Sequence, residues 1–148
     1  MKPIREYAAA RSLSADVVLN PKGKHVATVR AHFADSGRVV VEVCHTDGET
    51  KTQRASAGGY GYDKFHSALA GLTIDGHTMA DHSDGYNLPD AVTRLALDGV
   101  WTRAIAERLP KGYHCANYNE AKGGYTSCFK DHGYRYLQAL GYTIISAI

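Results

Sequence analysis

The chain has 148 residues, of which 44% are hydrophobic and 22% charged, so it is long enough to bury a core without a disulfide or metal staple. Its net charge of +2 comes from interspersed acidic and basic residues. This balance argues against a DNA mimic and gives little support to a dedicated nucleic-acid binder.

Three cysteines without a CxxC pair, and an opening without a signal-peptide pattern, predict a reducing, cytoplasmic setting. No apolar run approaches the ~18 residues that a membrane span requires. The sequence therefore predicts a chain that does not interact with membranes.

The first half of the chain predicts a sheet. A short helix is expected over residues 3–12, followed by a brief apolar segment, ADVVLN, which a turn closes. Period-two alternation then predicts three strands, HVATVRAHF, RVVVEVCHT and TKTQRASA, as an antiparallel meander. The dipeptide Asp47-Gly48 predicts a two-residue hairpin between the second and third of these strands.

A Gly-rich stretch, AGGYGYDKFHSALAGL, follows the meander. Phe65, Ala68, Leu69 and Leu72 share one face, which predicts a helix over 62–71 with Gly71 at its end. The glycines are interpreted as a strand-to-helix corner rather than a phosphate cradle, because no complete phosphate-binding motif is present and Asp63 would repel an anion.

The second half carries weaker patterns. Residues 75–87 are polar and aperiodic and predict a loop, and helices are expected over 89–98, through Trp101 to Leu109, and over 131–140. Residues 113–129 show turn residues throughout and predict an irregular loop. The closing YTIISAI predicts a last strand.

Together these elements predict a single α+β domain over 1–148. Its antiparallel sheet would consist of the meander and the C-terminal strand, with the helices at 62–71, 89–98 and 131–140 covering one face.

Two clusters of reactive side chains suggest chemistry. His77, Asp81, His82 and Asp84 share one loop but lack a recognised zinc spacing, so a solvated loop is favoured. Residues 113–132 concentrate His114, Cys115, Cys128 and His132, which leaves a cysteine- or metal-dependent enzyme open as an alternative. Cys44, on a predicted strand, is interpreted as structural.

The order helix, three antiparallel strands, Gly-rich turn and helix over residues 3–72 resembles the topology of double-stranded RNA-binding domains. That family begins its second helix with clustered lysines, whereas this chain has Lys64 alone beside Asp63. The resemblance implies a shared topology, and direct nucleic-acid binding is disfavoured.

The stretch ASAGGYGYDKFHSALAGL, with the terminal GYRYLQALGYTIISAI, resembles small accessory proteins of phages and prophages. This resemblance implies an inhibitor of the anti-CRISPR kind, which occludes a host protein or ribonucleoprotein complex without catalysis, cofactor or metal. Ten tyrosines suggest the binding surface. The candidate contact residues are Tyr60, Tyr62, Lys64, Tyr113, Tyr118, Lys122 and Tyr125.

Two further hypotheses remain open beside the enzyme. The Gly-rich corner at 58–64 suits a sponge that sequesters a nucleotide ligand. A homodimer is also compatible with the sequence.

Overall fold

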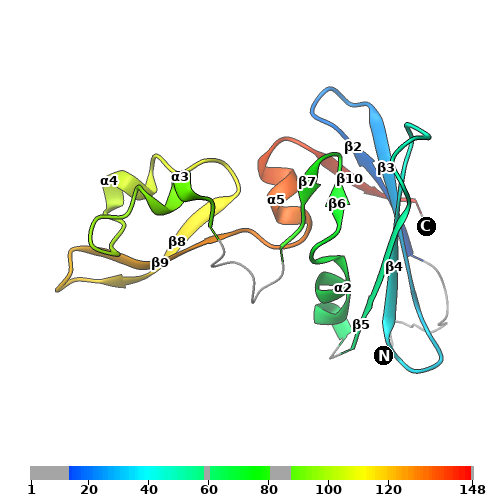
Figure 1. Cartoon of the computed structure of the whole chain (residues 1–148), viewed down its shortest axis with the longest axis horizontal. Helices are drawn as coiled ribbons and strands as arrows, with labels where there is room; N and C mark the ends of the chain where they lie inside the picture. Colours follow the sequence, from blue (N-terminus) through cyan, green and yellow to red (C-terminus); the bar gives the residue numbers. More distant parts are fainter. Residues whose placement is uncertain (1–13, 59–60, 81–87, 148) are drawn as a thin grey trace.

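The structure is a computed structural model, and it describes residues 14–58, 61–80 and 88–147, with the backbone alone at 61–63. The described part is mostly antiparallel sheet with a few short helices (Figure 1). The elements are β2 Ser14–Leu19, β3 His25–Phe33, β4 Val39–His45, β5 Gln53–Ala57, α2 Gly61–Leu69, β6 Thr73–Ile74, β7 His77–Thr78, α3 Asp90–Thr93, α4 Arg103–Ala106, β8 Tyr113–Asn119, β9 Gly124–Lys130, α5 Tyr134–Ala139 and β10 Thr143–Ser146.

The main sheet has five antiparallel strands in the order β10-β2-β3-β4-β5. Val29 lies opposite Val43 and Ala31 opposite Val41, and all four side chains are buried. The intervening Arg30 lies on the other face, so the period-two pattern decides which face is packed. The predicted meander and the predicted joining of the C-terminal strand are both confirmed.

The sheet has one strand more than the sequence predicted. The segment interpreted as a brief apolar stretch is β2, and it pairs with β3 on one side and with β10 on the other. Four consecutive strands therefore precede α2, which differs from the three-strand order of double-stranded RNA-binding domains. The helix expected over 3–12 lies outside the described residues.

Of the three Asp-Gly dipeptides in the described residues, two form tight turns and one does not. Asp75-Gly76 and Asp98-Gly99 have positive φ at both residues, the type I′ geometry that closes two-residue hairpins. The first joins β6 to β7, so the loop predicted from residue 75 onward is wrong at its start.

The predicted two-residue hairpin at Asp47-Gly48 is also wrong, because seven residues separate β4 from β5. There the Asp47 carboxylate accepts hydrogen bonds from Thr50 and from the Glu49 amide, and these bonds lower its pKa. Asp47 thus organises a wider loop through an Asx-type turn.

The helices are shorter than predicted and do not all cover the sheet. α2 packs against β4 and β5, and α5 contacts β10, as expected (Figure 1). The helix predicted over 89–98 is only the four-residue α3, and its buried Val92 belongs to a different cluster from the sheet core. Residues 113–129, predicted to be irregular, belong to the β8–β9 hairpin, which ends at Lys130.

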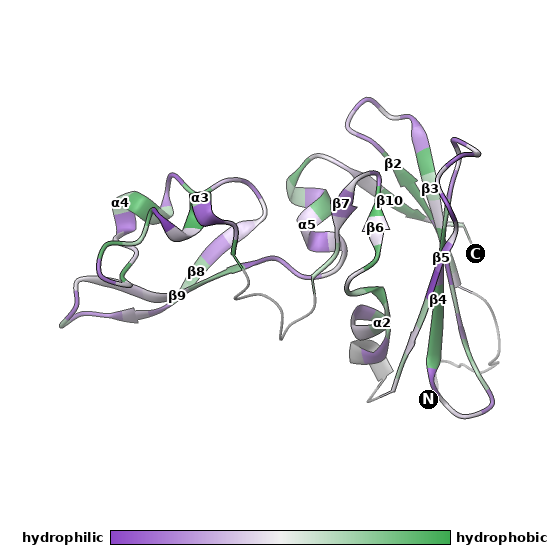
Figure 2. Cartoon of the chain, viewed as in Figure 1, coloured by the Kyte–Doolittle hydropathy of each residue, from purple (hydrophilic) through white to green (hydrophobic). Residues whose placement is uncertain are grey.

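Hydrophobic side chains form two clusters. The first lies between the sheet and the elements α2, β6 and α5, with Met79 added just after β7, and Figure 2 shows its hydrophobic β4 strand beside α2. The second, which we call the hairpin cluster, lies where α3 and α4 pack against β8 and β9, and its buried members are Val92, Trp101, Ile105 and Cys128. No helix among residues 14–58, 61–80 and 88–147 is both long and apolar enough to cross a membrane.

The two clusters meet at a small aromatic contact. The rings of Tyr113 on β8 and Tyr136 on α5 lie 6.2 Å apart, edge to face. The Lys130 ammonium group lies 4.0 Å from the centroid of the Tyr136 ring and donates a hydrogen bond to the Thr78 carbonyl. Lys130 is half-buried in this contact, and its partial burial lowers its pKa.

A half-buried carboxyl in the sheet, that of Asp16, gives a testable pH dependence. Burial raises the pKa of Asp16 above its ordinary value of 3.8, although a hydrogen bond from the Tyr134 hydroxyl at 2.8 Å partly lowers it. The fold therefore favours protonated Asp16, and this contribution to stability is present below the ordinary pKa and is lost as pH rises through the raised one.

We expect the free energy of unfolding of the wild type, relative to Asp16→Asn, to fall as the pH rises from below the ordinary pKa of 3.8 through the raised pKa of Asp16. Urea denaturation of both proteins across this range measures the difference. A difference that instead grows with pH would show that the Tyr134 hydrogen bond to the carboxylate outweighs desolvation.

Candidate functional site

The segment around Trp101 pairs with the edge of the β8–β9 hairpin. Trp101 and Tyr125 exchange two backbone hydrogen bonds, with N···O distances of 2.9 and 2.7 Å. Gly124 allows this approach, because a Cβ at that position would lie 2.6 Å from the Trp101 carbonyl oxygen. The arrangement fixes the start of α4 against β9.

Helix α4 presents Arg103 to solvent. Thr102 caps the helix by accepting a hydrogen bond from the Ile105 amide at 3.2 Å, and the Ile105 side chain is buried in the hairpin cluster. Arg103 lies on the exposed side of this single helical turn. The cap and the buried Ile105 thus determine where the guanidinium group lies.

Arg103 lies over the ring of Tyr118, and Tyr118 in turn contacts Tyr125. The guanidinium carbon lies 4.3 Å from the centroid of the Tyr118 ring, and the rings of Tyr118 and Tyr125 meet edge to face at 5.1 Å. A hydrogen bond to Tyr118 is the main cause that raises the pKa of Arg103. Tyr118 is 39% exposed, one of the few large exposed hydrophobic side chains in the described part of the chain. We call these three residues the Tyr118 surface.

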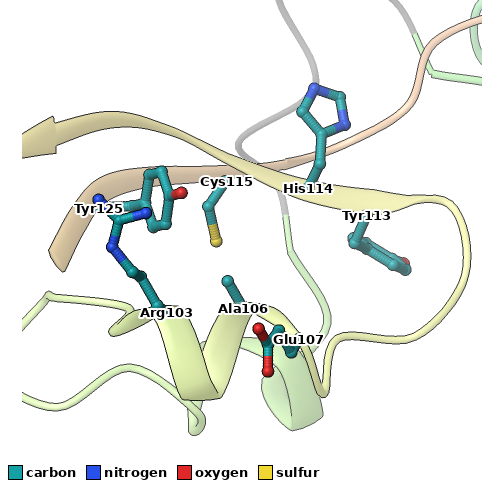
Figure 3. A pocket seen from close by; sticks show the side chains of 7 residues that line it. All are labelled: Arg103, Ala106, Glu107, Tyr113, His114, Cys115 and Tyr125. Atoms are coloured by element: carbon teal, nitrogen blue, oxygen red, sulfur yellow. The ribbon is translucent and has the colours of Figure 1, made fainter.

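A shallow pocket of about 280 Å³ adjoins the Tyr118 surface (Figure 3). Arg103 and Tyr125 lie at one end of it and Tyr113 at the other, while Cys115 points from β8 toward α4. The lining residues are Arg103, Ala106, Glu107, Tyr113, His114, Cys115 and Tyr125. The pocket therefore combines one cation, one carboxylate and an aromatic wall.

The two cysteines of this hairpin are not activated. Burial raises the pKa of Cys115, and burial together with the neighbouring Cys115 raises that of Cys128 to about 12. Both thiols are therefore mostly protonated at neutral pH, whereas a cysteine that serves an enzyme as a catalytic nucleophile has a lowered pKa. The His114 Nδ1 atom lies 2.5 Å from a carboxylate oxygen of Asp131, and the His114 ring points away from Cys115 (Figure 3).

The other predicted site residues lie apart from this surface. Lys64 on α2 donates a hydrogen bond to the Gly37 carbonyl at 2.8 Å and lies 5.9 Å from the centroid of the Phe33 ring, which ties it to the β3–β4 turn. Lys122, in the turn of the β8–β9 hairpin, is exposed. Tyr60 and the side chain of Tyr62 lie outside the described residues.

Of the seven candidate contact residues, the structure brings Tyr113, Tyr118, Lys122 and Tyr125 together on one hairpin and leaves Lys64 beside the sheet (Figure 1). Arg103 was not identified as a site residue from the sequence, although its guanidinium group lies over the ring of Tyr118. Its only sequence signal is the Thr102 cap that starts a new helical turn.

The metal hypothesis gains no geometric support. Within residues 14–58, 61–80 and 88–147, no three His, Cys, Asp or Glu side chains are placed to hold a metal ion together. His77 is described and contacts the rings of Tyr136 and Tyr142, but Asp81, His82 and Asp84 lie outside the described residues.

When it is compared with protein-family models, with curated proteins and with solved structures, the chain shows no match.

Proposed function

We propose that the chain is a binding protein that acts by occluding a partner protein through the Tyr118 surface. The observation that carries this proposal is the stack of Arg103, Tyr118 and Tyr125 on the solvent side of the β8–β9 hairpin. The narrower proposal, based on the resemblance to phage accessory proteins, is that the partner belongs to a bacterial defence complex of the CRISPR kind.

Residue type and rigidity support a binding role. Tyr and Arg are enriched among the side chains that contribute most to protein–protein affinity. Here each limits the motion of the other before any partner arrives, so association orders few additional rotamers. The hairpin that carries them packs on the buried side chains of the hairpin cluster.

The charges beside the stack favour a protein partner over nucleic acid. Glu107 lines the same pocket as Arg103, and Glu120 lies in the turn with Lys122. Carboxylates at these places repel phosphates, whereas a protein surface can offer Lys or Arg to them. A nucleic-acid partner would instead give an affinity that falls steeply with added salt.

The test is an interference assay in bacteria that carry active CRISPR systems of several types. We expect the wild-type chain to restore phage plaquing against at least one type, and the double variant Arg103→Ala, Tyr118→Ala to lower that effect at least about tenfold. Arg94→Ala is the matched control, because it removes an exposed arginine at the C-cap of α3 and leaves Arg103, Tyr118 and Tyr125 in place.

Binding to the purified effector complex of the responding type, measured at two salt concentrations, links the effect to contact. Unchanged inhibition by the double variant would rule out the Tyr118 surface. If the wild-type chain inhibits no CRISPR type, the narrower proposal of a defence complex as partner is wrong. Direct binding of the chain to another purified protein would still support the broader proposal that it occludes a partner protein.

A further inference from the structure

Two cysteines lie directly opposite each other in the β8–β9 hairpin. In the register of the two strands, Cys115 is the partner of Cys128. Opposed residues of an antiparallel pair have Cα atoms roughly 4.5 to 5.5 Å apart, and a disulfide spans roughly 4.4 to 6.8 Å. The backbone therefore already has the spacing that a cross-strand disulfide needs.

The side chains are placed toward each other as well. Opposed residues project from the same face of a strand pair, and Cys115 and Cys128 both contribute to the hairpin cluster. Each thiol also affects the pKa of the other, as expected for two sulfur atoms that lie close together. Both cysteines are free in this structure.

The two thiols differ in solvent access, and this difference determines which of them reacts first with an oxidant. Cys115 lines the pocket of about 280 Å³ and points into it, whereas Cys128 is 1% exposed (Figure 3). A small reagent in solution therefore reaches the sulfur of Cys115 but not that of Cys128. Cys115 also forms a thiolate at lower pH than Cys128, because burial raises the pKa of Cys128 further.

We propose that Cys115 and Cys128 form a reversible disulfide site that small-molecule disulfides of the glutathione type oxidise. The Cys115 thiolate attacks one sulfur of the oxidant, forms a mixed disulfide and releases one thiol. The Cys128 thiolate then attacks the sulfur of Cys115, closes the intramolecular bond and releases the second thiol. The two protons leave with the released thiols, and the oxidant takes up the two electrons.

Cys44 supplies an internal comparison. It lies on β4 opposite Thr28, where Arg30 donates to its sulfur at 3.6 Å and its thiol donates to Glu42 at 3.7 Å. The register places no other cysteine opposite it, so Cys44 lacks a partner to resolve a mixed disulfide. The inference concerns the hairpin alone and does not depend on the proposed function.

The experiment exposes the folded Cys44→Ser chain to oxidised glutathione, then alkylates free thiols and measures the intact mass. We expect two alkylatable thiols to become none, with no glutathione retained, and dithiothreitol to restore both. Because exchange proceeds through the thiolate, its rate should rise roughly tenfold for each pH unit between about pH 7 and pH 9.

Two results would overturn the proposal: both thiols staying alkylatable after prolonged oxidation at pH 9, or a stable glutathione adduct on a chain that retains Cys128. In the wild type, peptide mapping should find the Cys115–Cys128 bond and, at most, a mixed disulfide at Cys44. The variant Cys128→Ser should stop at a mixed disulfide on Cys115. Should that variant fail to fold, the Cys44→Ser result decides by itself.

Discussion

Trp101→Ala should lower the free energy of unfolding of the hairpin cluster by about 3–5 kcal/mol, the usual cost of removing a large buried aromatic side chain. Trp101 is 8% exposed and is by far the largest buried member of that cluster. Helices α3 and α4 have four residues each, too few to be stable without the packing that Trp101 provides.

Hydrogen exchange of the native protein measures this effect where it occurs. We expect amide protection to fall in Tyr113–Asn119 and Gly124–Lys130 and to persist in β3 and β4, because the sheet has its own core. Leu97→Ala is the matched control: Leu97 is 64% exposed, and its truncation should change stability by less than about 0.5 kcal/mol.

An equal loss of protection in β3, β4, β8 and β9 would contradict this expectation. It would show that the two clusters unfold as one cooperative unit, despite the small contact between Tyr113, Lys130 and Tyr136. The same measurement therefore also tests the prediction, made from the sequence, of a single domain over 1–148.

Leu137→Ala should lower the free energy of unfolding of the sheet by about 2–5 kcal/mol. Leu137 is the buried residue of α5, and it joins that helix to the core formed by β2, β3 and β4. Truncation removes its methyl groups from a site with no exposed surface, so neighbouring side chains must either leave a cavity or shift.

Urea denaturation followed by far-UV circular dichroism reports this loss for the sheet. Tryptophan fluorescence follows the hairpin cluster separately, because Trp101 is the single tryptophan of the chain. Gln138→Ala is the control on the same helix, since Gln138 is exposed and Ala is a good helix former. Equal midpoints for Leu137→Ala and Gln138→Ala would contradict the position of α5 in the core.

The sequence predicted the sheet well where one face of each strand is packed and the other is polar. Val29, Val41 and Val43 alternate with Thr28, Arg30 and Glu42, and that local pattern suffices to assign both strands and their faces. Strand β2 was harder to predict, because most of its residues are half-buried between β3 and β10 and its alternation is weak.

Turn chemistry was informative but ambiguous. Within the described residues, Asp-Gly occurs at 47–48, 75–76 and 98–99, and only the first is interpreted as a hairpin signal from the sequence, where the structure has a wider loop. The residues after Asp47 explain why this turn differs from the other two. Thr50 donates hydrogen bonds from its amide and its hydroxyl group to the Asp47 carboxylate, which favours an Asx turn over a type I′ turn.

The β8–β9 hairpin was missed because its apolar side chains are mostly cysteine and tyrosine rather than valine or isoleucine, and its sequence is rich in Asn and Gly. Its strands are stable through tertiary contacts, namely the hydrogen bonds between Trp101 and Tyr125 and the packing of Ile105. Local propensity carries no information on such contacts.

The sequence by itself determined the antiparallel sheet, its packed face and the helices α2 and α5, because these follow from residue periodicity that acts over a few neighbours. Only the tertiary structure decided that Arg103 stacks on Tyr118 and that Cys115 lies opposite Cys128. The two residues of the first pair are 15 positions apart in the sequence, and those of the second pair are 13 positions apart. Contacts across such separations depend on strand register and on a shared buried cluster, which no local pattern specifies.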